Sequence, residues 1–541
     1  MNISVKHVSA CAVSALFVLA AGMTVPAATA QAQKITWENC PSMVTTEGAQ
    51  CGHIEVPMDY SNPAGEKISV GFVKVPATNQ GAKRGALFIN SGGPGGDVYG
   101  YTASKAGAAW PAEMRAEWDL IGVQPRGLVG STPVECENVD QPSPTDMVSN
   151  VGKLYHDACA AKSSTAFLNS LTTENTARDW DEVRKALELN RIGIMGLSYG
   201  TILGSTYATL FPQHTDKVIL DSGIDTELLW NSVFELQRPA HVRSLHEYFA
   251  WIARNDATYH LGATPYAVYE KWAAAVVKES GANPTVKPPA MEPSEAPLGS
   301  SDLANATKPL EVQIQNFLTT ITQPGASQQR SATLQLTRML VPQTNTWNGM
   351  ARALNGTGPS LTEIAEKQQQ DSELMRVNET SQQMQQIILC NENHTPAHTE
   401  QVPAFLWNTF VKGDAFDQFI FYSSGVSCGG IQPVATVPQP DGSKLATRPL
   451  QIQGIHDPQT PYGNFTNMQQ RMNSQLITVN SFRHGHVGMG NDAVDKAVVE
   501  YLRTGNSPIT EAPGEPISAG EGRAPRLVAL ISSAMQTPML R

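Results

Sequence analysis

The chain of 541 residues is 41% hydrophobic and 16% charged, which suits a large folded domain with an insertion and excludes a largely disordered chain. Its formal net charge is −11, and no run of Lys or Arg supplies the basic face that nucleic acid or an anionic membrane requires. We therefore expect neither as a partner.

Residues 1–30 have the features of a secretory signal peptide. Lys6 precedes an apolar run over residues 8–21, and the small residues 28–30 resemble a cleavage site. The apolar run is shorter than the ~20 residues that a membrane-spanning helix needs, which disfavours an uncleaved anchor. We expect a secreted or periplasmic protein with no stable membrane association.

Removal of this segment leaves six cysteines. An even number in an exported chain suits three disulfides, whereas a zinc site is disfavoured because the sequence has no C-x-x-C pair. Proximity in the sequence favours the pairing Cys40–Cys51, Cys136–Cys159 and Cys390–Cys428 among the possible connectivities.

Short apolar runs bounded by Gly, Pro and Asp recur in the first half of the chain. They cover residues 68–75, 85–89, 118–123, 192–195 and 218–220. Helical patterns over residues 176–189 and 201–210 lie between the later runs. This alternation predicts an α/β fold with a mostly parallel sheet flanked by helices.

A helical, polar insertion is predicted over residues 223–446, with helices at 230–257, 266–279, 310–321 and 361–389 and an exposed proline-rich loop at 283–297. Strand-like runs return at 449–455 and 476–482. The expected organisation is a core of residues 31–222 and 447–505, a helical cap at 223–446, and a loosely attached C-terminal extension at 506–541.

The segment Gly196-Leu197-Ser198-Tyr199-Gly200 is the candidate nucleophile elbow. An apolar strand precedes it and a helical segment follows, as the sharp turn that exposes a catalytic serine requires. The pattern G-x-S-x-G occurs by chance too readily to identify an enzyme alone. Its position between strand and helix makes Ser198 the predicted nucleophile.

A serine nucleophile in this fold needs an acid and then a histidine further along the chain. Asp457 is the acid candidate, because it directly follows a predicted strand, although an Asp-Pro turn is the alternative reading. His486 is the predicted base, and His484 is its rival. A His-x-His pair could also bind a metal or lie on the surface.

A glycine-rich turn follows the predicted strand at residues 85–89. Backbone N–H groups of Gly92 and Gly93, together with that of Tyr199, are the candidates for an oxyanion hole. A phosphate-binding loop is the rival interpretation, but the Lys-Ser/Thr of a nucleotide site is missing. We expect no metal or organic cofactor.

Several motifs together resemble the proline-iminopeptidase-like α/β-hydrolases, and among them the secreted tripeptidyl aminopeptidases of bacteria. The resemblance covers nearly the whole mature chain. It rests on Gly92-Gly93-Pro94-Gly95, Pro125-Arg126-Gly127, the serine motif, Asp457-Pro458-Gln459-Thr460-Pro461 and Gly485-His486. Gln124, Val129, Ser91 and Asp97 depart from the family's usual residues, which leaves the substrate preference open.

The resemblance implies the triad Ser198, Asp457 and His486, with Gly92 and Gly93 in the oxyanion hole. It also suggests Glu392 as a carboxylate that binds the protonated N-terminal amine of a substrate, although a solvated loop glutamate is an equally good reading. The implied function is an aminopeptidase that releases short peptides, such as tripeptides, from free N-termini through an acyl-enzyme. The alternatives are a carboxylesterase or amidase and a secreted binding protein on a hydrolase scaffold.

Overall fold

The computed structural model describes residues 34–104, 107–138, 143, 145–296, 300–323, 326–412 and 419–520, all within the unit Gln33–Arg541. The expected signal peptide at residues 1–30 lies outside the described residues, as do residues 521–541 of the expected C-terminal extension. Among the residues described, no helix is both long enough and apolar enough to cross a membrane.

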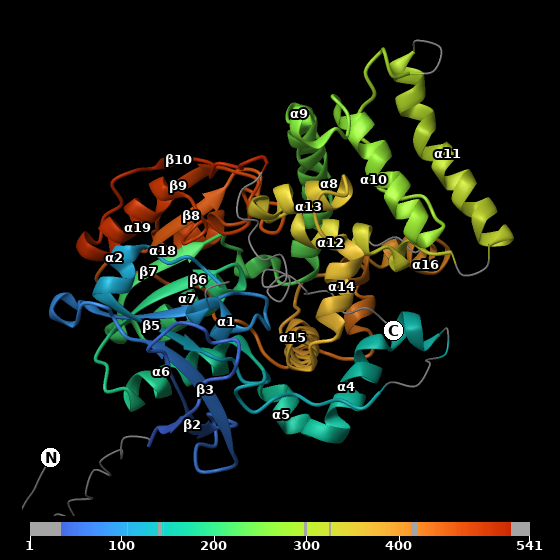
Figure 1. Cartoon of the computed structure of the whole chain (residues 1–541). Coiled ribbons are helices and arrows are strands. Elements are labelled where there is room, and N and C mark those ends of the chain that lie inside the picture. Colours follow the sequence, from blue (N-terminus) through green and yellow to red (C-terminus); the bar gives the residue numbers. More distant parts are fainter. Residues whose placement is uncertain are drawn as a thin grey trace, which may run out of the picture. The chain divides into compact units, whose positions relative to one another are not determined.

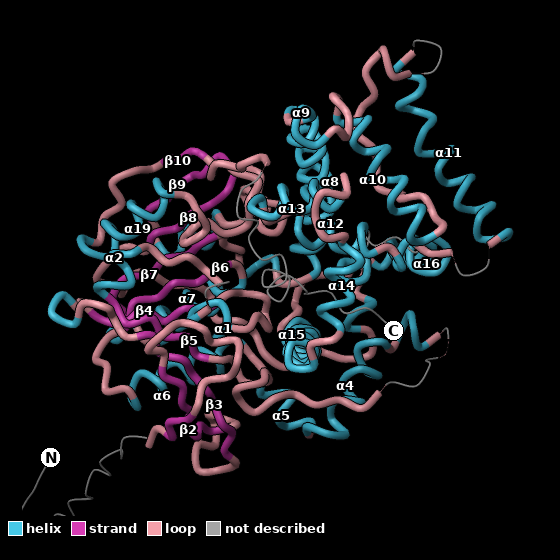
Figure 2. The backbone as a smooth tube through the Cα atoms, viewed as in Figure 1, coloured by secondary structure: helices cyan, strands magenta, loops and turns pink. Residues whose placement is uncertain are grey.

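Strands of the described chain form one ten-stranded sheet in the order β1-β2-β3-β5-β4-β6-β7-β8-β9-β10 (Figure 2). From β5 to β10 all neighbours are parallel, whereas β1, β2 and β3 add to one edge in antiparallel fashion. The mostly parallel sheet is confirmed. The strands are β1 (Thr36–Glu38), β2 (Gln50–Pro57), β3 (Lys67–Val75), β4 (Gly85–Asn90), β5 (Trp118–Val123), β6 (Ile192–Leu197), β7 (Thr215–Asp221), β8 (Leu450–Gly454), β9 (Gln475–Asn480) and β10 (Glu511–Pro513).

Helices pack against both faces of the sheet. Successive strand residues point to opposite sides, and in the central strands the apolar side chains on both sides are buried by helices. In β4, Leu87 and Ile89 join a buried cluster with residues of α1, α2 and α19, whereas Phe88 joins Trp180 of α6 and Tyr207 of α7 in another. The helices of the core are α1 (Val98–Ala103), α2 (Ala112–Glu117), α3 (Asp146–Ser149), α4 (Val151–Ser163), α5 (Thr165–Ser170), α6 (Thr173–Ala186), α7 (Tyr199–Leu210), α18 (Thr466–Met472) and α19 (Asp492–Thr504).

The described residues between β7 and β8 contain helices and no strand, as expected for the cap (Figure 1). Many of these helices share a hydrophobic cluster of their own, around Phe249, Trp272 and Trp347. The limits at residues 223 and 446 stay a prediction. The helices are α8 (Asn231–Arg254), α9 (Asp256–Tyr259), α10 (Pro265–Ser280), α11 (Ser301–Thr322), α12 (Ala332–Leu340), α13 (Trp347–Leu354), α14 (Leu361–Gln369), α15 (Ser372–Asn391), α16 (Val402–Leu406) and α17 (Phe419–Ser423), with a π-helical turn at Trp407–Lys412.

Three local expectations are corrected. The predicted helix over residues 361–389 is two helices, because Asp371 accepts a hydrogen bond from the N–H of Leu374 and so starts α15. The proline-rich loop is irregular as expected, but Val286 and Met291 within it are buried. Residues 506–520 are not loosely attached, since β10 pairs with β9.

All three expected disulfides are present, namely Cys40–Cys51, Cys136–Cys159 and Cys390–Cys428. The first joins the loop after β1 to β2, and the last lies within the cap. Each cross-link reduces the conformational freedom of the unfolded chain.

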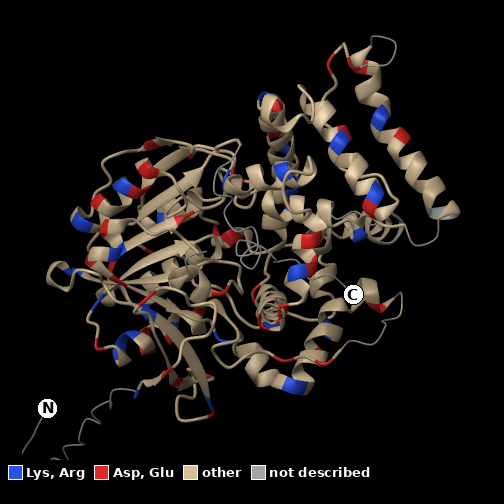
Figure 3. Ribbon diagram, in the orientation of Figure 1, with Lys and Arg blue, Asp and Glu red and all other residues tan. Residues whose placement is uncertain are grey.

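Charged residues of both signs are interspersed along the ribbon (Figure 3). The pair Arg126–Asp179 differs from the surface pairs because both side chains are buried. Arg126 donates two hydrogen bonds to the Asp179 carboxylate, at 2.8 and 2.6 Å, and the Tyr60 hydroxyl donates a third. This group ties the loop after β5 to α6.

Replacement of Asp179 by Ala is expected to lower the free energy of unfolding by about 3–5 kcal/mol, because the Arg126 guanidinium is then buried without its counter-ion. Urea denaturation measures the change. Glu174→Ala, which removes the half-exposed pair Glu174–Arg178 on the same helix, is the matched control and should cost less than about 1 kcal/mol. Equal losses in the two variants would contradict the prediction.

Candidate active site

Ser198 occupies the tight turn between β6 and α7. Its backbone lies in an unusual region, with φ 58° and ψ −124°, and its N–H donates to the carbonyl of Asp221 at 2.9 Å. A side chain at Gly196 is impossible here, since a Cβ atom would lie 2.0 Å from the carbonyl oxygen of Gly200. The half-buried hydroxyl of Ser198 is thus held on a turn that only a glycine-flanked sequence can form.

The glycine-rich loop after β4 lies directly against this turn. A Cβ atom on Gly92 would be 2.8 Å from Cβ of Ser198 and 3.4 Å from the backbone nitrogen of Tyr199. The N–H of Gly92 donates to the side-chain oxygen of Asn90 at 2.9 Å, so it is not available for an oxyanion. Of the expected donors, Gly93 and Tyr199 remain candidates, and Gly92 contributes by its lack of a side chain.

Asp457 follows β8, and its carboxylate accepts four hydrogen bonds. Oδ1 accepts from the N–H groups of Gln459 and Thr460, whereas Oδ2 accepts from the Thr460 hydroxyl at 2.8 Å and from Nδ1 of His484 at 2.9 Å. Burial, which leaves 1% of the residue exposed, raises the pKa of this carboxyl. The electrostatic attraction and hydrogen bond of His484 and the bonds from Thr460 outweigh burial, so the pKa lies below its usual value. Asp457 is therefore held as a carboxylate.

The structure pairs His484, and not the expected His486, with Asp457. The chain turns at Gly485, which has φ 83°, and the Asp221 carboxylate accepts the N–H groups of His486 and Val487 at 2.7 and 2.9 Å. These bonds direct the His486 ring into the protein, with its Nε2 2.9 Å from where a Cβ of Gly454 would lie. Neither ring nitrogen of His486 has a hydrogen-bond partner in the described part of the chain.

The loop that carries His484 packs beside the nucleophile. A Cβ atom on Gly485 would lie 3.0 Å from the side chain of Leu197, the residue before Ser198, and the N–H of Gly485 donates to the Ser222 hydroxyl. Since Asp457 occupies Nδ1 of His484, Nε2 is the ring nitrogen left for proton transfer.

Glu392 has a different environment from that of a substrate anchor. It is 2% exposed, and its two carboxylate oxygens accept from the N–H and the hydroxyl of Thr173, at 2.6 and 2.8 Å. The same hydroxyl lies 2.9 Å from that of Tyr199. Glu392 therefore caps the first turn of α6, and the structure does not bring it to Ser198 as an exposed carboxylate.

Sequence reasoning missed the residues that orient these groups. Asn90, Asp221 and Thr460 each lie in or beside a motif, but nothing in the motif assigned them a role. A hydroxyl three residues after an aspartate is a common local hydrogen-bonding pattern, and it could have indicated Thr460. Within the described residues, no three His, Cys, Asp or Glu side chains gather as possible metal ligands.

The buried Glu392 predicts a pH-dependent stability. Burial, partly offset by the bonds from Thr173, raises its pKa from 4.5 to about 7. Between these values the folded state holds a proton that the unfolded state has lost, so stability falls as the pH rises through this interval. In the unsubstituted protein, the unfolding free energy should fall by an amount on the order of 3 kcal/mol between about pH 5 and about pH 8 because of Glu392. In Glu392→Gln this fall should be absent, as measured by urea denaturation.

Glu379→Gln is the matched control, since Glu379 is exposed on α15, the helix that Glu392 directly follows. It should retain the pH dependence of the unsubstituted protein. If Glu392→Gln and Glu379→Gln behave alike, burial of Glu392 is not the cause.

Comparison with known proteins identifies similar families and relatives. A family model described as "alpha/beta hydrolase fold" matches residues 86–367, and one described as "TAP-like protein" matches residues 415–513. A tripeptidyl aminopeptidase of Streptomyces lividans is 34% identical over 285 residues, which are 48% of this chain and 53% of that protein. The chain thus spans about half the length of that relative.

Two proteins of Mycobacterium tuberculosis match over most of their length. A serine protease is 26% identical over 88% of this chain and 90% of its own, and carboxylesterase B is 26% identical over 91% of both chains. These matches confirm the resemblance expected from the motifs. Since the first family model spans more than half of the chain, and the sheet order and the turn at Ser198 agree with it, the chain belongs to the alpha/beta hydrolase fold family.

Proposed function

We propose that the chain is a serine hydrolase with Ser198 as nucleophile, His484 as base and Asp457 as acid. The observation that carries the proposal is the 2.9 Å contact between Nδ1 of His484 and the buried Asp457 carboxylate, beside the turn that presents Ser198. His484 replaces His486 in this proposal, because His484 and not His486 is hydrogen-bonded to Asp457.

In the proposed reaction, Nε2 of His484 accepts the hydroxyl proton while Ser198 Oγ forms a bond to the substrate carbonyl carbon. The carbonyl electron pair moves onto the oxygen, which faces the N–H groups of Gly93 and Tyr199. When this electron pair re-forms the carbonyl double bond, the bond to the leaving group breaks, and the leaving group takes the proton from His484. Water then repeats the sequence on the acyl-enzyme, with His484 again accepting and returning the proton.

We propose peptides with a free N-terminus as substrates. Support comes from the Streptomyces relative, a tripeptidyl aminopeptidase, and from the serine protease of Mycobacterium. Contacts from the cap add to it: Ser381 of α15 donates to the carbonyl of Gly95 in the glycine-rich loop, and the N–H of His484 donates to the carbonyl of Pro342. A site approached by the cap from two sides suits a chain end better than a folded protein.

Ester hydrolysis is the alternative, favoured by the carboxylesterase relative that matches nearly the full length. The same nucleophile and oxyanion donors serve both reactions. We also propose that the protein acts outside the cytoplasm, because three disulfides persist in an oxidising compartment.

The two histidines give a direct test of the base. His484→Phe should slow labelling of Ser198 by a fluorophosphonate probe by about 1,000-fold or more, because the serine loses its proton acceptor. His486→Phe should label at nearly the rate of the unsubstituted protein, since it replaces a buried ring that makes no hydrogen bond to the described residues. The reverse order of the two rates would restore His486 as the base.

Three chromogenic substrates separate the proposed activities. A tripeptide amide with a free amine should be cleaved, and its N-acetylated form should not, because acetylation removes the positive charge at the chain end. A short-chain aryl ester tests the alternative, and Ser198→Ala controls each reaction. Equal cleavage of both amides, or cleavage of the ester alone, would exclude the aminopeptidase, whereas activity retained in Ser198→Ala would exclude the whole mechanism.

A further inference from the structure

The cap helix α8 holds the residue that lies two positions after the proposed acid. Gln237 of α8 donates from its side chain to the carbonyl oxygen of Gln459 at 2.8 Å. One turn further along, Nε2 of His241 lies 2.9 Å from the side-chain oxygen of Gln459. Both the backbone and the side chain of Gln459 are thus bound to the same helix.

Gln459 passes this constraint to the catalytic acid. Its N–H donates to Oδ1 of Asp457 at 2.8 Å, on the oxygen that His484 leaves free. Gln459 is therefore the single residue that connects α8 to the Asp457 carboxylate, and it does so through hydrogen bonds on both sides.

The environment of His241 favours a role in binding Gln459 over a role in packing alone. It is 3% exposed, its ring centroid lies 5.0 Å from that of Phe419, and its Nδ1 has no hydrogen-bond partner among the described residues. An apolar side chain would pack on Phe419 without burying an unpaired nitrogen. Burial and then the charge of Arg338 lower the pKa of His241 to about 3. The ring is neutral and adds no charge beside Asp457, and because the side-chain oxygen of Gln459 can only accept, Nε2–H is the donor.

We propose that Gln237 and His241 are positioning residues for the triad, which fix the Asp457 carboxylate through Gln459 and so make its alignment with His484 depend on the seated cap. This inference rests on the proposed serine hydrolase function. A hydrogen bond that orients the acid affects the rate of proton transfer, whereas it leaves the contacts of a bound substrate unchanged.

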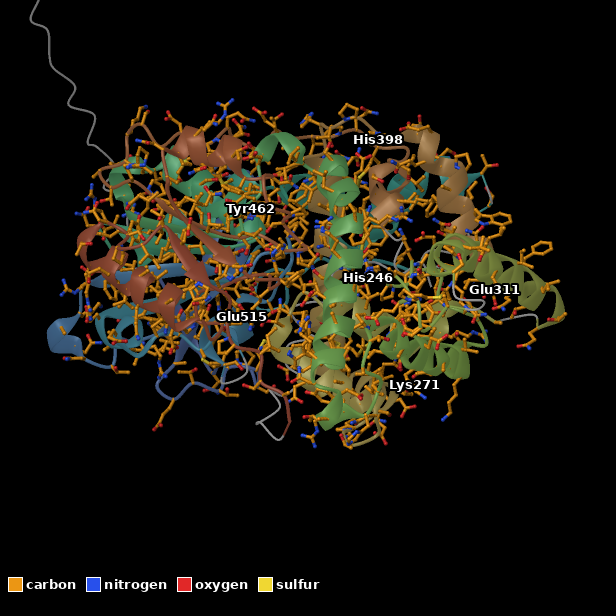
Figure 4. The ribbon with its side chains drawn as sticks, turned by 90° about the horizontal axis from the view of Figure 1, so that it is seen from above. His246, Lys271, Glu311, His398, Tyr462 and Glu515 are labelled. Atoms are coloured by element: carbon orange, nitrogen blue, oxygen red, sulfur yellow. A yellow bond between two sulfur atoms is a disulfide. The ribbon has the colours of Figure 1, made fainter. Side chains whose placement is uncertain are left out.

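The test compares His241→Phe with His246→Phe. His246 lies on the same helix (Figure 4), and its Nε2 is 2.7 Å from the carbonyl of Lys287, away from the acid loop. His241→Phe should lower both kcat and the rate of fluorophosphonate labelling of Ser198 by about tenfold, the equivalent of one hydrogen bond, with KM unchanged. His246→Phe should change neither rate.

Two further variants separate positioning from stability. His241→Gln keeps an amide N–H at the reach of Nε2 and should restore most of the rate. In a Gln459→Ala background, His241→Phe should have no additional effect, because the side-chain oxygen that His241 binds is already missing. A full additional tenfold loss in that background, or no rescue by His241→Gln, would overturn the proposal.

Proton NMR gives a readout that needs no activity. The Nδ1 proton of His484, hydrogen-bonded to Asp457, should resonate far downfield in the unsubstituted protein and in His246→Phe, and should shift or broaden in His241→Phe. If Ser198 proves unreactive in every variant, the proposed function fails, and the NMR signal alone then decides the positioning role. An unchanged signal in His241→Phe would overturn it.

Discussion

The backbone of Ser198 is the constraint on which the site depends. At φ 58° the chain reverses from β6 into α7 within one residue, and this turn requires open space on both sides. Gly196 supplies it within the turn, and Gly92 supplies it from the loop after β4. Asn90 in turn holds Gly92 by accepting its N–H. The strained backbone of Ser198 thereby restricts which residues can stand at the end of β4 as well as in its own turn.

Asp221 extends this arrangement to the loop that carries the proposed base. It ends β7, the strand between β6 and β8, and its carbonyl accepts the N–H of Ser198 while its carboxylate accepts the N–H groups of His486 and Val487. One residue thus anchors both the nucleophile turn and the loop after β9. Because parallel strands end at the same edge of a sheet, the topology alone brings loops that are far apart in the sequence together there.

The features that could be predicted are those determined by local sequence. The buried parallel strands form continuous apolar runs, and the elbow at Ser198 lies between one of them and a helix. Strand β2 could not be recognised because Cys51, Gly52 and His53 interrupt the apolar pattern, and β10 is only three residues long. The choice between His484 and His486 depends on bonds to Asp221, 265 residues away in the chain, and no local pattern reports such a contact. The burial of Glu392 could not be predicted for the same reason, since its partner Thr173 is distant in the sequence.

The position of the cap in the chain explains why it reaches the catalytic loops. The insertion leaves the core directly after Asp221, at the edge of the sheet where the proposed site lies, and it returns just before β8, the strand that leads into Asp457. The disulfide Cys390–Cys428 closes a span of 38 residues within the cap at the end of α15, the helix whose Ser381 contacts the glycine-rich loop. Cross-linking that span restricts the positions open to α15. The cap therefore shares its hydrogen bonds with the loops that carry the proposed oxyanion donors, the proposed base and the proposed acid, and a displacement of the cap would disturb all three.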